Sequence, residues 1–199
     1  MAEKRNKKKE EKLSWQQSVL LYAHDMTYLL LIVMLVFLLI FRIIVVSGGS
    51  MRMTLLDGDY LLLLNNTFYH TPKRGDIVVI SKESFDNGKP IVKRVIATEG
   101  QTVDIDFENG IVYVDGTALE EDYINAPTTV NGGTSFPLTV ARGCIFVLGD
   151  NRGISMDSRY PEVGQIDKRE VLGKAILLMY PGTDEDTYPR DFSRVGAIQ

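Results

Sequence analysis

The sequence predicts an all-β domain preceded by one N-terminal transmembrane helix. The first observation is an almost purely apolar run of fifteen residues, Thr27 to Phe41. The second is a change after Asp57 to short apolar or alternating runs separated by turn residues, which is typical of β-strands. The third is size, because 199 residues with 45% hydrophobic content suffice for one ordinary domain after the N-terminal segment.

Composition and charge exclude several classes of protein. The single cysteine, Cys144, leaves no internal disulfide and no basis for a zinc cluster built on cysteines. The two histidines, His24 and His70, lie in no motif typical of a metal site or a Ser-His-Asp triad. Six of the 22 basic and three of the 26 acidic residues lie in residues 1–12, so the remainder has 16 basic and 23 acidic residues. This acidic remainder argues against nucleic acid as a partner.

Residues 1–25 are predicted to form a basic cytoplasmic tail and residues 26–46 a transmembrane helix. The fifteen apolar residues rise only about 22 Å as a helix, but extension through Val46 gives about 30 Å, the thickness of the hydrocarbon core. Since basic residues precede this segment and few follow it closely, residues 47–199 are expected outside the cytoplasm. A cleaved secretory signal and a buried core helix are the alternatives. The apolar run is longer than the usual apolar region of a signal sequence, and the later chain has too little apolar volume to surround it.

The remainder of the chain is expected to be mostly β-structure, with turn signals such as Asn87-Gly88 and Asn109-Gly110 between strands. The polar segment Thr183 to Gln199 is expected to be a loosely held tail. The predicted strands are Tyr60–Leu64, Ile77–Ser81, Ile91–Thr98, Thr102–Asp106, Ile111–Val114, Cys144–Leu148 and Val171–Met179.

A flexible loop that carries a hydroxyl, Ser50, begins where the apolar segment stops. Gly48 and Gly49 relax the backbone limits before it, while Met51 and Leu55 supply apolar surface beside it. This pattern is consistent with a nucleophile loop, although a juxtamembrane linker has a similar composition. If Ser50 is a nucleophile, its base is not expected to be a histidine.

Lys93 is the best candidate for that base. The period of two in a strand places Ile91, Lys93 and Val95 on one face, so the amine emerges among apolar neighbours. At an ordinary pKa of about 10.4 only roughly 0.04% of lysine is neutral at pH 7, and burial lowers the pKa. The alternative is a lysine at a strand edge whose amine reaches into solvent.

The third notable stretch, Gly149 to Arg159, follows a predicted apolar strand and is rich in hydrogen-bonding groups. Ser155 or Ser158 is placed to orient a neutral lysine, and the alternative is an ordinary polar turn. Charge-assisted bonds would hold the loop rigid through Asp150, Arg152, Asp157 and Arg159.

Together these stretches resemble bacterial type I signal peptidases, which are membrane-anchored serine proteases with a Ser/Lys dyad. The resemblance covers roughly residues 28–180, and its motifs agree in order, spacing and position after the membrane segment. The motifs are Ser50-Met51, Arg74-Gly75-Asp76-Ile77-Val78, Lys93-Arg94-Val95, Gly149-Asp150-Asn151-Arg152 and Ser155-Met156-Asp157-Ser158-Arg159.

The resemblance implies that Ser50 is the nucleophile, Lys93 the general base and Ser155 the hydroxyl that positions the lysine amine. It implies a structural ion pair between Asp157 and Arg159, and another between Asp150 and Arg94. It also implies an all-β catalytic core, similar to that of LexA-like proteases, with a small β insertion within residues 99–142. No metal or organic cofactor is expected.

Two positions depart from the family pattern. Met53 stands where the family usually has proline, which is expected to loosen the loop without removing a reacting group. Gly48 replaces a serine whose hydroxyl joins the oxyanion hole in some members, so the hole would depend on backbone N–H groups, chiefly that of Ser50.

The implied activity is endoproteolytic removal of N-terminal signal peptides from secretory precursors at the outer face of the cytoplasmic membrane, through an acyl-enzyme. A substrate segment would add as a strand alongside Val45–Gly49 or Pro90–Lys93, with small residues selected by pockets built from Met51, Leu55 and Val92. The other partners considered are membrane lipid and the secretion machinery.

Two rival functions remain open from the sequence. One is a membrane-anchored β-domain that binds an envelope partner, with Lys93 charged and Ser50 solvated. The other is a self-cleaving LexA-like protease, which the membrane anchor, the acidic body and the absence of a DNA-binding segment disfavour.

Overall fold

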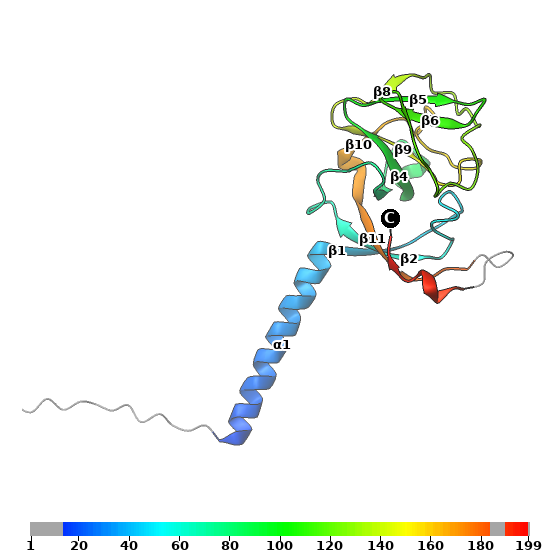
Figure 1. The fold of residues 1–199 in the computed structure, drawn as a ribbon. Coiled ribbons are helices and arrows are strands. Elements are labelled where there is room, and N and C mark those ends of the chain that lie inside the picture. The colour runs from blue at the N-terminus through cyan, green and yellow to red at the C-terminus, as the bar shows by residue number, and fades with distance from the viewer. Residues whose placement is uncertain (1–13, 184–189, 199) are drawn as a thin grey trace, which may run out of the picture. The chain divides into compact units, whose positions relative to one another are not determined.

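The computed structural model describes residues 14–183 and 190–198, and it divides the chain into two units, residues 1–39 and 40–199. The first unit contains one helix. The second unit contains the β-strands, and its fold is mostly β-sheet, as the sequence predicts (Figure 1).

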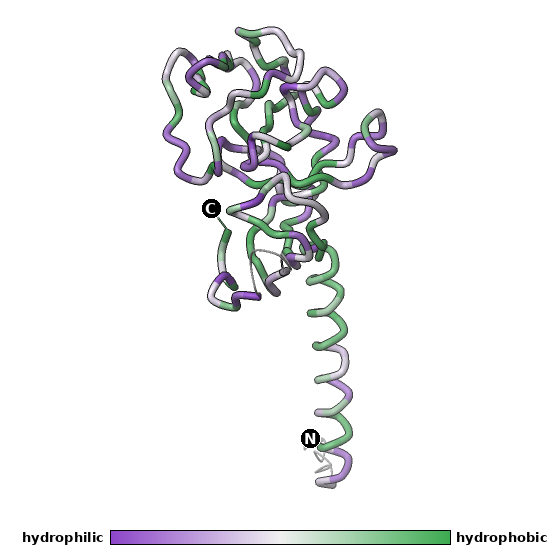
Figure 2. Tube along the Cα trace, turned by 90° about the vertical axis from the view of Figure 1, so that its right-hand side faces the viewer, coloured by the Kyte–Doolittle hydropathy of each residue, from purple (hydrophilic) through white to green (hydrophobic). Residues whose placement is uncertain are grey.

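Helix α1 (Trp15–Ile40) is the only helix in the described residues that is long and apolar enough to cross a membrane. None of its side chains is buried by protein, and its residues are hydrophobic along most of its length (Figure 2). Its start is fixed by a capping box, in which Ser14 Oγ accepts from the Gln17 N–H and Gln17 Oε1 from the Ser14 N–H. Its 26 residues give a length of about 39 Å.

These bounds differ from the predicted helix over 26–46 at both ends. The helix begins earlier than predicted because the capping box at Ser14 starts it. It ends earlier than predicted because the next residues form β1 (Phe41–Val45). Ile43, Ile44 and Val45 are β-branched, and β1 pairs antiparallel with β2 along its whole length. Their backbone N–H and C=O groups therefore form the hydrogen bonds of a sheet rather than those of a helix.

The larger sheet has the strand order β1-β2-β11-β3-β4-β9-β10, with β12 on β11, and all its pairs are antiparallel. In β4 every residue from Val92 to Ala97 is buried, so the strand runs through the middle of the domain. The other strands of this sheet are β2 (Tyr60–Asn65), β3 (Ile77–Ile80), β4 (Ile91–Thr98), β9 (Cys144–Leu148), β10 (Ile166–Asp167), β11 (Val171–Tyr180) and β12 (Gly196–Ala197).

A second sheet, in the order β7-β6-β5-β8, lies at one end of the β-unit (Figure 1). Its strands fall within residues 99–142, the segment expected to be an insertion. Its apolar face packs with Ile96, Phe146 and Leu148 in one buried cluster, so it covers β4 and β9. The strands are β5 (Thr102–Asp106), β6 (Ile111–Val114), β7 (Thr117–Ala118) and β8 (Leu138–Thr139).

All seven predicted strands are present, each within one residue of its predicted bounds. The strands that were not predicted are β1 and four two-residue strands, which are too short to show periodicity. The prediction of a loosely held C-terminal tail is wrong for residues 190–198. There β12 pairs with β11, and Arg194 donates at 2.6 and 3.0 Å to the buried Asp59 carboxylate. Residues 184–189 and 199 lie outside the described residues.

Candidate active site

Ser50 and Lys93 meet at the centre of the β-unit. Ser50 lies in the turn that follows β1, and Lys93 is the third residue of β4. The Lys93 Nζ donates to Ser50 Oγ at 2.7 Å and to the Val92 carbonyl oxygen at 3.0 Å. Only 3% of Lys93 is exposed, which excludes the alternative of a lysine reaching into solvent.

Burial is the main cause of an unusual pKa at Lys93. Desolvation, opposed by the charges of Asp157 and Asp150 and assisted by that of Arg159, lowers the pKa of its amine from 10.5 to about 8. At a pKa near 8 about a tenth of the amine is neutral at pH 7, against less than a thousandth for an ordinary lysine. The amine is therefore able to accept a proton near neutral pH.

The backbone of the Ser50 turn is held from outside the turn. The Gly48 residue has φ +88°, a left-handed conformation that favours glycine, and its N–H donates to Asp57 Oδ1 at 2.7 Å. Asn151 donates its backbone N–H to the Ser50 carbonyl at 2.9 Å and its side-chain amide to the Gly49 carbonyl at 3.0 Å. The Ser50 N–H donates to no residue within the described ranges, so it is available for an oxyanion.

Asn151 therefore fixes the turn that carries Ser50. Asn151 belongs to one of the quoted motifs, but no role in holding Ser50 was predicted for it. Its place after an apolar strand is the only sequence feature that could have indicated this role.

Ser155 differs from its expected role. It is 1% exposed, and its Oγ has no hydrogen-bond partner among the described residues, so it does not bond the Lys93 amine in this structure. A Cβ at Gly149 would overlap both the Ser155 hydroxyl and the Ser50 carbonyl oxygen, so these two residues approach each other over a glycine. The other candidate, Ser158, accepts the Val147 N–H at 3.0 Å and is engaged in holding β9.

The ion pair expected between Arg94 and Asp150 is present and buried. Arg94 donates through Nε at 2.9 Å and through Nη2 at 2.8 Å, with the two side chains 3% and 0% exposed. Thr54 donates its hydroxyl to the same carboxylate, and the Tyr123 ring lies 3.9 Å from the guanidinium. The pair therefore joins the Ser50 turn, β4 and the loop after β9.

The ion pair expected between Arg159 and Asp157 is also present, and both side chains are fully buried. Arg159 donates to the carboxylate at 2.8 and 2.9 Å and to the carbonyls of Arg152 and Ser155 at 2.9 and 3.2 Å. Asp157 accepts the Gly149 N–H at 3.0 Å, so the pair holds the glycine over which Ser50 and Ser155 meet.

Arg152 lies in a third buried ion pair, which the sequence did not indicate. Its guanidinium donates to both oxygens of the Glu121 carboxylate at 2.7 and 3.0 Å and to Thr128 Oγ1 at 2.6 Å. Glu121 and Thr128 lie in the long connection between β7 and β8. No local pattern marks such a partner, because 31 residues separate it from the arginine.

A pocket of about 260 Å³ opens beside Ser50. Apolar side chains from β1 and from the start of β4 line it, and they include the predicted Met51 and Val92. Leu55, which was also predicted to line this pocket, is 1% exposed and lies at a different one. Leu55 nevertheless packs with Met51 and Val92 in one buried cluster, so the three predicted side chains lie together although the pocket that Leu55 reaches is a different one.

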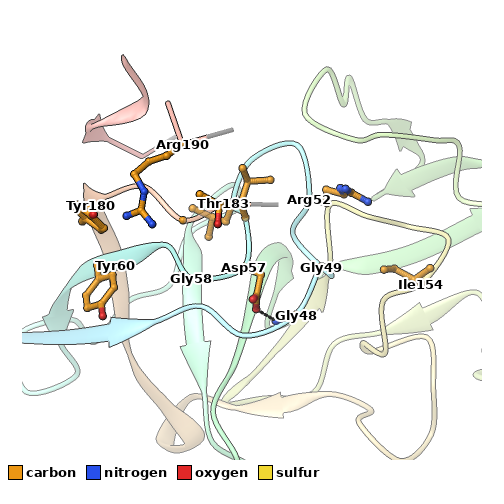
Figure 3. A pocket seen from close by; sticks show the side chains of 13 residues that line it. Gly48, Gly49, Arg52, Asp57, Gly58, Tyr60, Ile154, Tyr180, Thr183 and Arg190 are labelled. Atoms are coloured by element: carbon orange, nitrogen blue, oxygen red, sulfur yellow. Dashed lines mark hydrogen bonds between the residues drawn. The ribbon is translucent and has the colours of Figure 1, made fainter. Parts of the chain in front are cut away.

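The pocket that Leu55 reaches measures about 630 Å³, and Gly48 and Gly49 are among its lining residues. Figure 3 shows Asp57 bonded to Gly48 at its centre, Tyr180 and Arg190 at one side and Ile154 at the other. Among the described residues no group of three or more His, Cys, Asp or Glu side chains is placed to hold a metal ion.

Comparisons with known proteins relate this chain to one family. The family model described as "Signal peptidase, peptidase S26" matches residues 19–180. A probable signal peptidase I-1 of Synechocystis sp. is 36% identical over 140 residues, which cover 67% of this chain and 68% of the relative. Signal peptidase I of Bacillus licheniformis is 34% identical over 139 residues, which cover 66% and 72%.

Two further matches cover the chains less evenly. A probable signal peptidase I of Mycobacterium leprae is 34% identical over 149 residues, which cover 58% of this chain and about half, 51%, of the relative. A crystal structure of a signal peptidase I from Enterococcus faecalis V583 is 34% identical, with a TM-score of 0.43, and the match covers 52% of this chain and 96% of the other.

Proposed function

The chain belongs to the signal peptidase family, peptidase S26, and within the serine peptidase activity of that family we propose that Ser50 is the nucleophile and Lys93 the general base. The observation that carries this proposal is the 2.7 Å hydrogen bond between Ser50 Oγ and the buried Lys93 Nζ. A hydroxyl is a weak nucleophile until a neighbouring base accepts its proton, and Lys93 is the only base bonded to Ser50 among the described residues.

The reaction follows from these two groups. Neutral Lys93 accepts the proton of Ser50 Oγ while that oxygen attacks the carbonyl carbon of the scissile bond. The Ser50 N–H stabilises the resulting oxyanion. The Lys93 ammonium then donates its proton to the leaving amine, the C–N bond breaks, and an acyl-enzyme forms. Water, deprotonated by the neutral lysine, later releases the acyl group and restores the hydroxyl.

The surrounding ion pairs keep this geometry fixed. Asp157 holds the Gly149 backbone, and Asn151, two residues farther along the same loop, holds the Ser50 carbonyl. The loop is thus a rigid support against which the nucleophile and the base are positioned before substrate arrives, and such positioning lowers the barrier of an acyl transfer.

The substrates in this proposal are secretory precursors whose signal peptide occupies the 260 Å³ pocket in an extended form. Val45 and Val46 from the end of β1 and Pro90 and Val92 from β4 line it, so a peptide strand has backbone edges on both sides. The restricted volume between these side chains and Met51 favours small residues next to the scissile bond.

The proposal includes a membrane location. Residues 1–25, which include the first turns of α1, are assigned to the cytoplasm, the rest of α1 to the membrane and residues 47–199, with the insertion in 99–142, to the outer side. Nine residues separate Ile40 at the end of α1 from Ser50. Lipid and the secretion machinery are the neighbours that this location implies.

Cleavage of a model precursor with a small-x-small site tests the dyad. We expect the purified full chain in lipid to cut it, while Ser50→Ala abolishes cleavage and Lys93→Met lowers the rate by about 10²–10⁴-fold. Ser84→Ala and Lys73→Met are matched controls at exposed positions away from the site. Full activity in either dyad variant, with unchanged unfolding curves, would falsify the assignment and favour a binding function.

A further inference from the structure

The pocket beside Ser50 carries one charge. Its described lining is apolar or hydroxyl-bearing except for Lys89. Lys89 follows the short 3-10 turn Asp86–Gly88 and precedes Pro90, whose ring fixes the approach of the chain to β4. No functional role was predicted for Lys89 from the sequence.

The Lys89 ammonium is available to a ligand. Its backbone N–H donates to the Asp86 carbonyl at 3.0 Å, but its side chain forms no hydrogen bond or ion pair with any residue of 14–183 or 190–198. Three arginines near the site are already paired: Arg94, Arg152 and Arg159 are each bonded to a buried carboxylate. Lys89 is therefore the cation that an occupant of this pocket meets.

The strand geometry sets which substrate residue Lys89 meets. Lys93, whose amine reaches Ser50, is four residues after Lys89, and an extended chain rises about 3.3 Å per residue, so the two backbones are at most about 13 Å apart. The substrate segment in this proposal lies extended in the pocket and runs parallel to β4, with the same rise per residue. The substrate residue beside Lys89 is consequently about four positions before the scissile bond, and the flexible lysine stem extends this to positions three to five.

From this placement we propose that Lys89 makes the enzyme prefer precursors with an acidic side chain three to five residues before the scissile bond. The inference rests on the proposed function and adds a charge preference to it. Because Lys89 is exposed to solvent, the pair that it forms with a substrate carboxylate is partly screened. The corresponding preference is about two- to fivefold in kcat/KM.

The test uses three model precursors that share one small-x-small site and carry Asp, Asn or Lys at the fourth position before the bond. We expect wild type to cleave them in the order Asp, Asn, Lys, with about two- to fivefold steps in kcat/KM at low salt. Lys89→Gln should remove the preference and Lys89→Glu should reverse it. Lys73→Glu, which adds the same charge at an exposed turn outside the pocket, should keep the wild-type order.

The outcomes separate this inference from the proposed function. Equal kcat/KM for the three precursors in wild type, or an unchanged order in Lys89→Glu, overturns the role of Lys89 while cleavage of the Asn precursor leaves the dyad standing. Failure of wild type to cleave even the Asn precursor overturns the proposed function itself. A preference that shrinks as salt is raised supports a direct charge interaction.

Discussion

Buried polar groups are paired in the loop after β9 but not at the Ser50–Lys93 centre. In the loop after β9, each buried charge has a partner: Arg94 with Asp150, Arg152 with Glu121, and Arg159 with Asp157. At the reacting centre, Lys93 is buried without a carboxylate partner and the Ser155 hydroxyl has no partner among the described residues. The loop that supports the site therefore pairs each of its buried charges. At the proposed reacting centre, by contrast, polar groups are buried without such partners among the described residues.

This division has a physical reason. A buried charge without a partner changes its pKa or destabilises the fold, so it is retained where the altered pKa is useful. A paired charge in the support loop fixes the geometry of the loop. The comparison can be tested by removing partners in the loop and polar groups at the centre.

The largest expected effect is in the support loop. Asp157→Ala leaves the Arg159 charge buried and frees the Gly149 N–H, so we expect the free energy of unfolding to fall by about 3–5 kcal/mol. Urea unfolding of the detergent-solubilised chain, followed by far-UV circular dichroism, measures it. The exposed pair of Arg169, which is 89% exposed, with Asp167 is the control, and Arg169→Ala should leave the unfolding curve essentially unchanged because solvent screens the pair. Equal costs would contradict the view that buried pairs carry the support.

A smaller effect is expected in the pH dependence of Lys93. Its pKa is about 8 in the folded chain against 10.5 ordinarily, so between these values the unfolded chain holds a proton that the folded chain has lost. The free energy of unfolding should therefore rise with pH across this window, by about 3 kcal/mol in total. Lys93→Met should lack this rise.

The cleavage rate of wild type should climb as the amine becomes neutral and level off above about pH 8. A difference between wild type and Lys93→Met that is flat from pH 7 to 11 would contradict the shifted pKa.

The smallest effect is expected at Ser155. Replacing its unpartnered buried hydroxyl by alanine removes a desolvated polar group, so Ser155→Ala should raise the free energy of unfolding by about 1 kcal/mol. Ser158→Ala is the matched control, since its hydroxyl accepts the Val147 N–H and its loss should lower stability by about 1–2 kcal/mol. If both variants lose stability equally, Ser155 has a partner in solution, as the resemblance to signal peptidases implied.

Strand positions were predictable because they depend on neighbours in sequence. Alternating or continuous apolar runs such as Ile91–Thr98 require a sheet, and glycine turns mark their ends. The Ser50 and Lys93 assignments also came from sequence, through their surroundings and through motifs in a fixed order. The end of α1 was missed because an apolar run does not distinguish a helix from a β-branched strand that finds a partner, here β2.

The sequence by itself determined the fold class, most of the strand positions and the two side chains proposed to react. Only the tertiary structure decided that Leu55 faces a different pocket from Met51, that Glu121 pairs with Arg152, and that Lys89 is the one charged residue in the described lining of the pocket beside Ser50. The reason is the range of the forces involved. Backbone geometry and burial periodicity repeat over a few residues, whereas a charge chooses its partner from all the elements that packing brings within a few ångströms of it.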